Sequence, residues 1–161
     1  MSSSPSTIDK FTGLPNREAG HGIINGSINH NGRVALLMCD INGFKTFNCS
    51  LGHAEGDRQL LRLARSLKEI VAPFPVFRSG DDEFCAVIQE RSLEEVRQMA
   101  TLILEAQKPD SANVEGQNKA VTITLSIGIA LFPYDAFDAQ SLWQAAEAAL
   151  LKAKQNGQLG N

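Results

Sequence analysis

The sequence predicts one α/β or α+β domain in which helices cover a mixed β-sheet. Two observations lead to this fold class. The chain has 161 residues, of which 43% are hydrophobic and 20% charged; this is enough for one domain with a sizeable core and too little to require two. Strand-like apolar runs also alternate with segments of helical periodicity, in the order strand, helix, hairpin, helix, strand, helix. Such an order is typical of helices packed on a sheet.

The first predicted elements are a buried strand and an amphipathic helix. Residues 33–39, RVALLMC, form a continuous apolar run that ends at the polar residues Asp40 and Asn42, which indicates a central strand. Residues 55–71 place leucine, alanine and isoleucine at helical spacing, so we expect an amphipathic helix there. Two prolines follow this segment and end the helix.

A hairpin and a second helix follow. Residues 76–79 (VFRS) and 84–88 (FCAVI) are short apolar runs on either side of an acidic turn, which predicts two paired strands. Residues 92–106 return to helical periodicity. Ser92 and Glu95 stand three residues apart at its start, the spacing of a capping box.

The last third of the chain predicts a loop, a strand and a helix. Residues 110–119 are polar and predict a surface loop, whereas residues 121–131 (VTITLSIGIAL) are apolar and β-branched and predict a strand. Residues 138–155 form an alanine-rich helical segment, and Gly157 follows it as a C-cap signal.

Composition argues against several classes of partner and compartment. The formal net charge is −3, whereas nucleic-acid and membrane-surface binders are usually basic. Cys39, Cys49 and Cys85 are odd in number and show no CxxC spacing, so we expect reduced thiols and no zinc site. No apolar run approaches the ~20 residues of a membrane span, and the start MSSSPST lacks the features of a signal peptide. We therefore expect a cytoplasmic protein.

Acidic side chains gather at two of the predicted strand ends. Asp40 ends the first strand, and Asp81, Asp82 and Glu83 form the tip of the hairpin. If both belong to one sheet, these carboxylates lie around a common point, where they repel each other unless a cation such as Mg²⁺ or Mn²⁺ lies between them. Carboxylate-bound metal ions that engage phosphates are the chemistry of polymerases and cyclases. Taken alone, however, the acidic turn is better explained as a solvated loop, because Asp favours tight turns.

Five segments raise the probability of the functional interpretation. They are DKFTGLPNR (9–17), CDINGFKTFNCSLGHAEGD (39–57), RSGDDEF (78–84), LSIGIALFP (125–133) and AAEAALLKAKQNG (145–157). In order and spacing they resemble the motifs of the GGDEF family, the diguanylate cyclases, with GDDEF as a variant of the signature. The resemblance implies a single GGDEF domain over residues 9–161, after a disordered or linker-like segment 1–8. Its implied fold is the palm of nucleotidyl cyclases, with a mostly antiparallel sheet of about five strands flanked by helices.

The resemblance also implies a reaction and a metal site. Two GTP molecules, each held by one subunit of a homodimer, would condense to cyclic di-GMP with release of two pyrophosphates. By similarity to the family, Asp40, the carbonyl of Ile41 and Asp82 would bind Mg²⁺ or Mn²⁺. The implied catalytic residues are Asp40, Asp82 and Glu83, the last tied to metal binding or proton removal.

Substrate-binding residues follow from the same resemblance. The implied set is Gly43, Phe44, Lys45, Asn48, Asp57, Gly80 and Lys154. Asn48 and Asp57 match the pair that binds guanine; a carboxylate can accept from both N1–H and the exocyclic amine of guanine, a pattern that adenine cannot supply. Lys45 and Lys154 match phosphate-binding lysines, and the backbone amides before Lys45 fit a phosphate at a helix start.

Several positions depart from the family pattern, among them Asn42, Cys49, Glu147 and Leu151. Asp81 replaces the second glycine of the signature, which in the family lets the hairpin approach the nucleotide; its charge opposes a triphosphate, and glycine would also allow positive φ. Gln158 replaces a phosphate-binding arginine. An inhibitory RxxD motif would fall on Val71 and Phe74, so we expect no inhibitory site of that kind.

Three hypotheses about function therefore stand: a diguanylate cyclase with weakened activity, a degenerate domain that binds GTP and regulates a partner, and a structural or dimerising module. Retention of five implied site residues argues against the third hypothesis: Asp40, Asn48, Asp57, Asp82 and Glu83. Asp81 and Gln158 favour reduced activity.

Overall fold

The computed structural model describes residues 5–30, 32–108, 122–156 and 159–160. The helices are α1 (Arg17–Ile28), α2 (Phe44–Leu51), α3 (His53–Val71), α4 (Leu93–Ala106) and α5 (Ala139–Asn156), and the strands are β1 (Val34–Ile41), β2 (Val76–Arg78), β3 (Glu83–Gln89), β4 (Leu125–Phe132) and β5 (Leu159–Gly160). Within these residues the strands form one five-stranded sheet in the order β2-β3-β1-β4-β5. Every pairing is antiparallel except that of β4 with β5, which confirms the predicted mostly antiparallel sheet.

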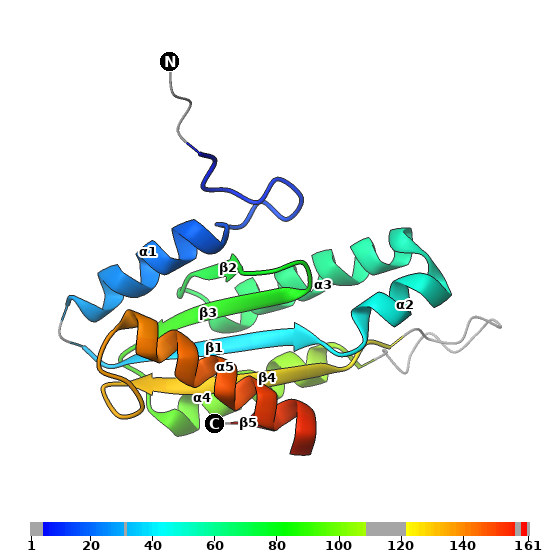
Figure 1. The fold of residues 1–161 in the computed structure, drawn as a ribbon. Helices are drawn as coiled ribbons and strands as arrows, with labels where there is room; N and C mark the ends of the chain where they lie inside the picture. The colour runs from blue at the N-terminus through cyan, green and yellow to red at the C-terminus, as the bar shows by residue number, and fades with distance from the viewer. Residues whose placement is uncertain (1–4, 31, 109–121, 157–158, 161) are drawn as a thin grey trace.

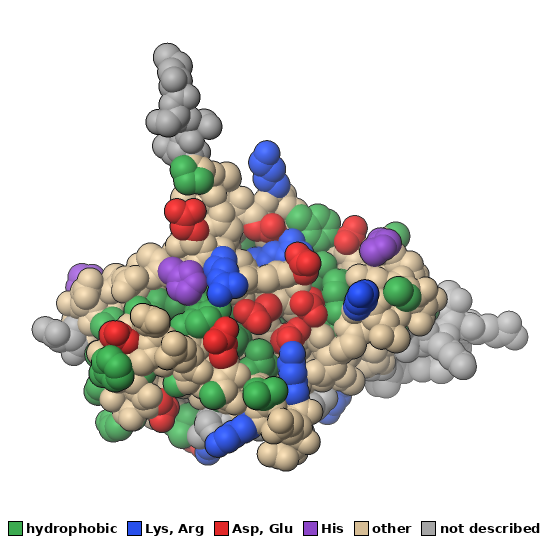
Figure 2. All heavy atoms as spheres, in the orientation of Figure 1, with side chains coloured by type: hydrophobic (Ala, Val, Ile, Leu, Met, Phe, Trp, Pro, Cys, Tyr) green, Lys and Arg blue, Asp and Glu red, His purple; other side chains and the backbone are tan. Residues whose placement is uncertain are grey.

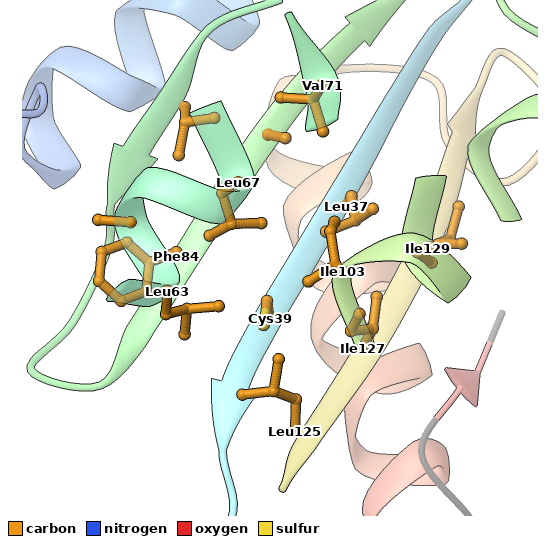
Figure 3. Packing of buried hydrophobic residues seen from close by; sticks show 14 of the residues in the cluster. Leu37, Cys39, Leu63, Leu67, Val71, Phe84, Ile103, Leu125, Ile127 and Ile129 are labelled. Atoms are coloured by element: carbon orange, nitrogen blue, oxygen red, sulfur yellow. The ribbon is translucent and has the colours of Figure 1, made fainter. Parts of the chain in front are cut away.

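The sheet lies between two layers of helices, with α1 and α5 on one face and α3 and α4 on the other (Figure 1). Its central strand β1 is buried along its whole length, which explains why its sequence is a continuous apolar run rather than an alternating one. Leu36 and Met38 pack with α1 and α5, whereas Leu37 and Cys39 pack with α3 and α4. Figure 3 shows this second layer, where Leu37 and Cys39 lie among leucines of α3 and an isoleucine of α4.

Most predicted elements are present, with small shifts in their bounds. The capping box of α4 is confirmed: the Glu95 amide donates to Ser92 Oγ at 3.2 Å, and the Ser92 amide donates to Glu95 Oε2 at 2.8 Å. The strand predicted from residue 121 begins at Leu125. The predicted loop at 110–119 and the C-cap signal at Gly157 lie outside the described residues. Helix α1 was not predicted, and of α2 only its start near Lys45 was expected, from the resemblance.

Close packing of α5 on the sheet fixes the position of its last turn. A Cβ on Gly128 of β4 would lie 2.3 Å from the Leu150 nitrogen and 2.7 Å from the Ala146 oxygen, so only glycine allows the two backbones to approach this closely. Leu150 is buried in this contact. Leu151, the residue beside it, is 57% exposed, because the next residue of a helix points about 100° away.

Candidate active site

The acidic residues of β1 and the signature hairpin meet at one end of the sheet. In the antiparallel register of β1 and β3, Asp40 stands opposite Glu83. The Ile41 amide also donates to the Asp82 carbonyl oxygen at 3.2 Å, which joins the end of β1 to the turn. The two acidic elements therefore lie side by side, as their membership of one sheet led us to expect. The face drawn in Figure 2 shows acidic side chains gathered near its centre, with lysine and arginine side chains around them.

Asp40 is the most buried of these acids, with 8% of the residue exposed. Its Oδ2 accepts a hydrogen bond from Lys154 Nζ at the end of α5. Its other oxygen, Oδ1, is buried and has no hydrogen-bond partner within the part of the chain that the structure describes. A buried carboxylate oxygen without a partner is unfavourable, and a bound cation would supply one.

Asp82 lies close enough to Asp40 for the two carboxyl groups to affect each other. The pKa of Asp82 is raised to about 6, first by burial and then by the negative charge of Asp40 and a hydrogen bond to it, while the charge of Lys154 acts in the opposite direction. A carboxyl group whose pKa is raised by an acidic neighbour is in a place that favours added positive charge.

These features test whether the implied metal fits the residues present. Carboxylate oxygens from Asp40 and Asp82, with the carbonyl of Ile41 between them in the chain, are hard ligands of the kind that Mg²⁺ and Mn²⁺ prefer. Among the described residues no group of three or more His, Cys, Asp and Glu side chains is arranged to hold a metal ion. The two carboxylates and the carbonyl would suit a divalent cation that takes further ligands from outside the protein, such as phosphate oxygens.

Glu83 has a different environment from the two aspartates. Its Oε1 accepts a hydrogen bond of 2.7 Å from Ser79 Oγ, and its backbone oxygen accepts from the Ser79 and Gly80 amides at 2.9 and 3.3 Å. The Glu83 carboxylate is thus oriented by the hairpin itself, on the strand opposite Asp40.

A cleft of about 590 Å³ lies beside the hairpin. It is lined by Phe44, Lys45, Asn48, Cys49, His53, Asp57, Leu60, Arg78, Asp81 and Asp82. The α2–α3 pair supplies one part of this lining and the signature hairpin the other. The fold thus brings Asn48 and Asp57, the residues implied to bind guanine, into the same cleft as Lys45 and Asp82.

The α2 side of the cleft contains unpaired polar groups. Asn48 Oδ1 is buried without a hydrogen-bond partner among the described residues; the side chain packs on Gly56, which leaves no room there for a Cβ. Gly43 precedes α2 with φ of 60°, and the helix has no side-chain N-cap. The amides of the first turn, including those of Phe44 and Lys45, are therefore not capped by a side chain at the position where an anion could accept from them.

The two predicted phosphate-binding lysines are in different places. Lys45 lines the cleft, whereas Lys154 reaches Asp40 from α5. Gly80 lies in the turn, where its carbonyl accepts from Arg78 Nε. Gln158, the residue in place of a family arginine, lies outside the described residues.

Asp81 is exposed at the edge of the cleft. Among the described residues, positive φ occurs at Gly13, Gly43, Gly52 and the single non-glycine Glu90. Neither Gly80 nor Asp81 is in that region, so this turn does not use the positive φ that glycine would allow at position 81. What Asp81 adds at this position is therefore a negative charge and side-chain volume.

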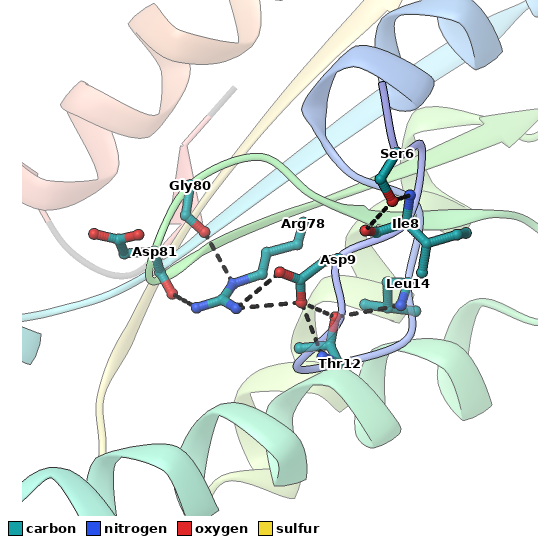
Figure 4. Close-up of polar contacts among 8 residues, drawn as sticks. All are labelled: Ser6, Ile8, Asp9, Thr12, Leu14, Arg78, Gly80 and Asp81. Carbon is teal, nitrogen blue, oxygen red and sulfur yellow. Dashed lines mark hydrogen bonds and ion pairs between the residues drawn. The ribbon is translucent and has the colours of Figure 1, made fainter. Parts of the chain in front are cut away.

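Arg78 was not predicted as a site residue, yet it organises the hairpin (Figure 4). Its Nη1 donates to both carboxylate oxygens of Asp9 at 3.2 Å. Its Nε and Nη2 donate to the carbonyls of Gly80 and Asp81 at 3.2 and 2.5 Å. The signal in the sequence was its place directly before the hairpin, together with Asp9 in the first motif. These contacts tie the amino-terminal loop to the acidic turn.

Comparisons with known proteins agree with this geometry. The family model described as "Diguanylate cyclase, GGDEF domain" matches residues 6–159. The bifunctional diguanylate cyclase/cyclic di-GMP phosphodiesterase MucR of Pseudomonas aeruginosa is 35% identical over 157 residues, covering 94% of this chain and 22% of that protein. Diguanylate cyclase A of Treponema denticola is 31% identical over 135 residues, covering 83% of this chain and 36% of that protein. The chain thus spans only about a fifth to about a third of these relatives.

Solved structures show the same fold. The GGDEF domain of TpbB (YfiN) from Pseudomonas aeruginosa superposes with a TM-score of 0.83 at 29% identity, over 94% of this chain and 90% of that one. A sensory box/GGDEF family protein from Caulobacter crescentus gives 0.81 at 28% identity, over 94% and 100%. None of the helices in the described ranges has the length and apolar character needed to cross a membrane. Because the family model matches nearly the whole chain, the chain belongs to the GGDEF family of diguanylate cyclase domains.

Proposed function

We propose that this domain is a diguanylate cyclase, with weakened activity, that condenses two GTP molecules into cyclic di-GMP and two pyrophosphates. The observation that carries the proposal is the shared cleft, in which Asn48 and Asp57 lie with Lys45 and Asp82. We take residues 9–161 as the bounds of the domain and a homodimer as its active form, because each subunit would hold one GTP and the product joins two.

The chain's own residues would act in three groups. Asn48 and Asp57 would hydrogen-bond the guanine edge, which selects guanine over adenine because the two bases present different donors and acceptors. Lys45 and the uncapped amides at the start of α2 would hold phosphate oxygens. A cation held by Asp40, Asp82 and the Ile41 carbonyl would neutralise the triphosphate and lower the pKa of the attacking 3′-hydroxyl.

Asp81 favours a second candidate function, GTP binding without turnover in a domain that regulates a partner. Its carboxylate adds negative charge to the lining of the cleft, where a triphosphate would be repelled from its productive position. PdeR of Escherichia coli is named a cyclic di-GMP phosphodiesterase rather than a cyclase. It is 31% identical over 153 residues, which cover 92% of this chain and 22% of that protein. A sequence of this family can thus occur within a protein named for another activity.

Product analysis separates the two candidates. Concentrated protein is incubated with GTP and Mg²⁺ or Mn²⁺, and the products are identified by chromatography and mass spectrometry. A version fused to a dimeric coiled coil removes the dependence on concentration. Cyclic di-GMP from the unmodified chain supports the cyclase. GTP binding by calorimetry without product, in both the free and the fused form, supports the regulatory domain, and no GTP binding at all rejects both.

A further inference from the structure

The ion pair between Lys154 and Asp40 connects the carboxyl-terminal helix directly to the acidic end of the sheet. Lys154 Nζ donates to Asp40 Oδ2 across 114 positions of the chain. The Asp40 side chain is only 12% exposed and the Lys154 side chain 41% exposed. The ammonium therefore enters the site from the solvent side and meets a carboxylate that is largely withdrawn from water.

The backbone packing of α5 brings the lysine to this place. Gly128 of β4 allows close approach at Leu150, one helical turn before Lys154. Ala153, next to the lysine, is buried against the sheet. The position of the lysine backbone is thus set by the core, and this places the side chain within reach of Asp40.

Lys154 compensates the charge of the acids incompletely. It occupies one oxygen of Asp40 and leaves Oδ1 buried without a partner among the described residues. Asp82 lies beside the same carboxylate, so two acids face one ammonium. A divalent cation and this ammonium would compete for the same carboxylate, because both interact with its negative charge.

We propose that Lys154 is a built-in counter-ion that holds Asp40 while no nucleotide is bound, and that a divalent cation must displace it to bind there. The inference rests on the proposed function of the site, in which a triphosphate supplies new acceptors for the released ammonium. The pair then disfavours metal binding without nucleotide and makes metal and GTP increase each other's affinity, since such coupling is reciprocal.

Metal binding in the absence of nucleotide tests this directly. The intact chain is titrated with Mn²⁺, and the free ion is measured by electron paramagnetic resonance. Lys154→Met should bind Mn²⁺ about fivefold more tightly than the unmodified chain, the effect of losing an ion pair at the upper end of the range for partly exposed pairs. Lys154→Arg keeps the positive charge and should bind Mn²⁺ as weakly as the unmodified chain.

Lys152→Met is the matched control. It removes the same charge from the same helix. Both lysines are exposed, but Lys152 lies roughly 200° around the helix axis from Lys154 and so on another side of the helix from the Asp40 pair. Its Mn²⁺ affinity should stay within about 1.5-fold of the unmodified chain, because exposed charges are strongly screened. Equal Mn²⁺ affinities for Lys154→Met and Lys152→Met overturn the proposal. If Lys154→Met does not fold by circular dichroism, Lys154→Gln replaces it with the same expected result.

The test of the Lys154 counter-ion is independent of the test of the proposed cyclase, because the Mn²⁺ titration uses neither GTP nor product formation. If Lys154→Met gains Mn²⁺ affinity but the unmodified chain does not bind GTP, the counter-ion stands and the cyclase fails. If the unmodified chain makes cyclic di-GMP but Lys154→Met does not gain Mn²⁺ affinity, the cyclase stands and the counter-ion fails.

Discussion

Two ion pairs join distant segments to the acidic end of the sheet, and they differ in how completely their polar atoms are paired. Arg78 donates to both oxygens of Asp9, and Asp9 also accepts from the Thr12 amide and hydroxyl at 2.8 and 2.6 Å. In the pair of Lys154 with Asp40, one carboxylate oxygen is bonded and the other is buried without a partner among the described residues.

The difference in pairing suggests different roles for the two ion pairs. Buried polar groups are nearly always paired, so a pair with its hydrogen bonds complete can serve as permanent structure. A buried carboxylate oxygen left without a partner is instead expected where a ligand completes the site. We therefore infer that the Arg78 pair stabilises the hairpin, whereas the Lys154 pair is exchanged when ligands bind.

The largest expected effect is that of removing the charge of Asp40. Asp40→Asn should reduce cyclic di-GMP formation at least about a hundredfold, because it removes a carboxylate from the proposed cation site. The free energy of unfolding should change little, since Lys154 is 41% exposed and can be hydrated once it loses its partner. Initial rates and urea unfolding measure the two effects.

Asp135→Asn controls for the loss of one negative charge. Asp135 accepts a hydrogen bond from the Leu131 amide at 2.8 Å, which an asparagine oxygen can also accept, and it lies beyond the opposite end of β4 from the acids. Turnover by Asp40→Asn at more than half the rate of this control would contradict an exchangeable role for the Lys154 pair.

The next effect is the loss of stability when Arg78 is removed. Arg78→Met should lower the free energy of unfolding by about 2–3 kcal/mol, because it leaves a partly buried carboxylate and two carbonyls without their donor. Arg58→Met is the control: Arg58 pairs with Glu55, but its side chain is 74% exposed, so about 0.5 kcal/mol or less is expected. Urea unfolding gives both values. If the two variants lose similar free energies of unfolding, the completeness of its hydrogen bonds does not make the Arg78 pair more stabilising than an exposed ion pair.

A smaller effect, on GTP affinity, is expected at Asp81, which lies between the Arg78 pair and the cleft. Its carbonyl is bound by Arg78, while its side chain lies in the lining of the cleft. Asp81→Gly and Asp81→Asn should both increase GTP affinity by about three- to tenfold, because each removes one negative charge near the triphosphate. Calorimetry at two salt concentrations measures the gain, which should shrink at high salt. A gain with glycine but not asparagine would show that backbone freedom or side-chain volume, rather than charge, limits binding.

Much of the fold could be predicted because its core elements have simple patterns. The buried run of β1 and the helical spacing of α3 follow from which faces pack on the core. Helix α1 was missed because three glycines interrupt its pattern. Only the start of α2 was expected, and its extent was not, because the helix has only eight residues, none of them buried. Strand β5 has two residues and depends on its parallel pairing with β4, which no local pattern predicts.

The candidate site could be predicted only where residues belong to paired strands or to motifs. That Asp40 lies near the hairpin acids followed from the sheet, and the register of β1 and β3 confirms it. The roles of these residues stay predictions. The contact between Lys154 and Asp40 could not be predicted, because it depends on how closely α5 packs on β4. The conformation of Asp81 could not be predicted either, because the motif alone does not show that the turn here uses no positive φ at that position.

The smallest expected effect concerns the dependence of stability on pH. Partial burial acts to raise the pKa of Asp9, but hydrogen bonds from the Thr12 hydroxyl and amide and the contact with Arg78 outweigh it and hold the pKa below its ordinary value of 3.8. The charged carboxylate is therefore favoured by folding. Its contribution to stability is fully present above pH 3.8 and is lost as the pH falls through the lower pKa of the folded state.

Asp9→Asn isolates this contribution from that of the other carboxylates. The unmodified chain and the variant are unfolded by urea in buffers from neutral pH to below pH 3.8, and the difference between their free energies of unfolding is followed. That difference should narrow at the acidic end, because protonation gives the unmodified chain a neutral side chain like that of the variant. A difference that stays constant with pH would mean that the Arg78 pair gains nothing from the charge of Asp9. The complete pairing of its atoms would then reflect hydrogen bonding alone.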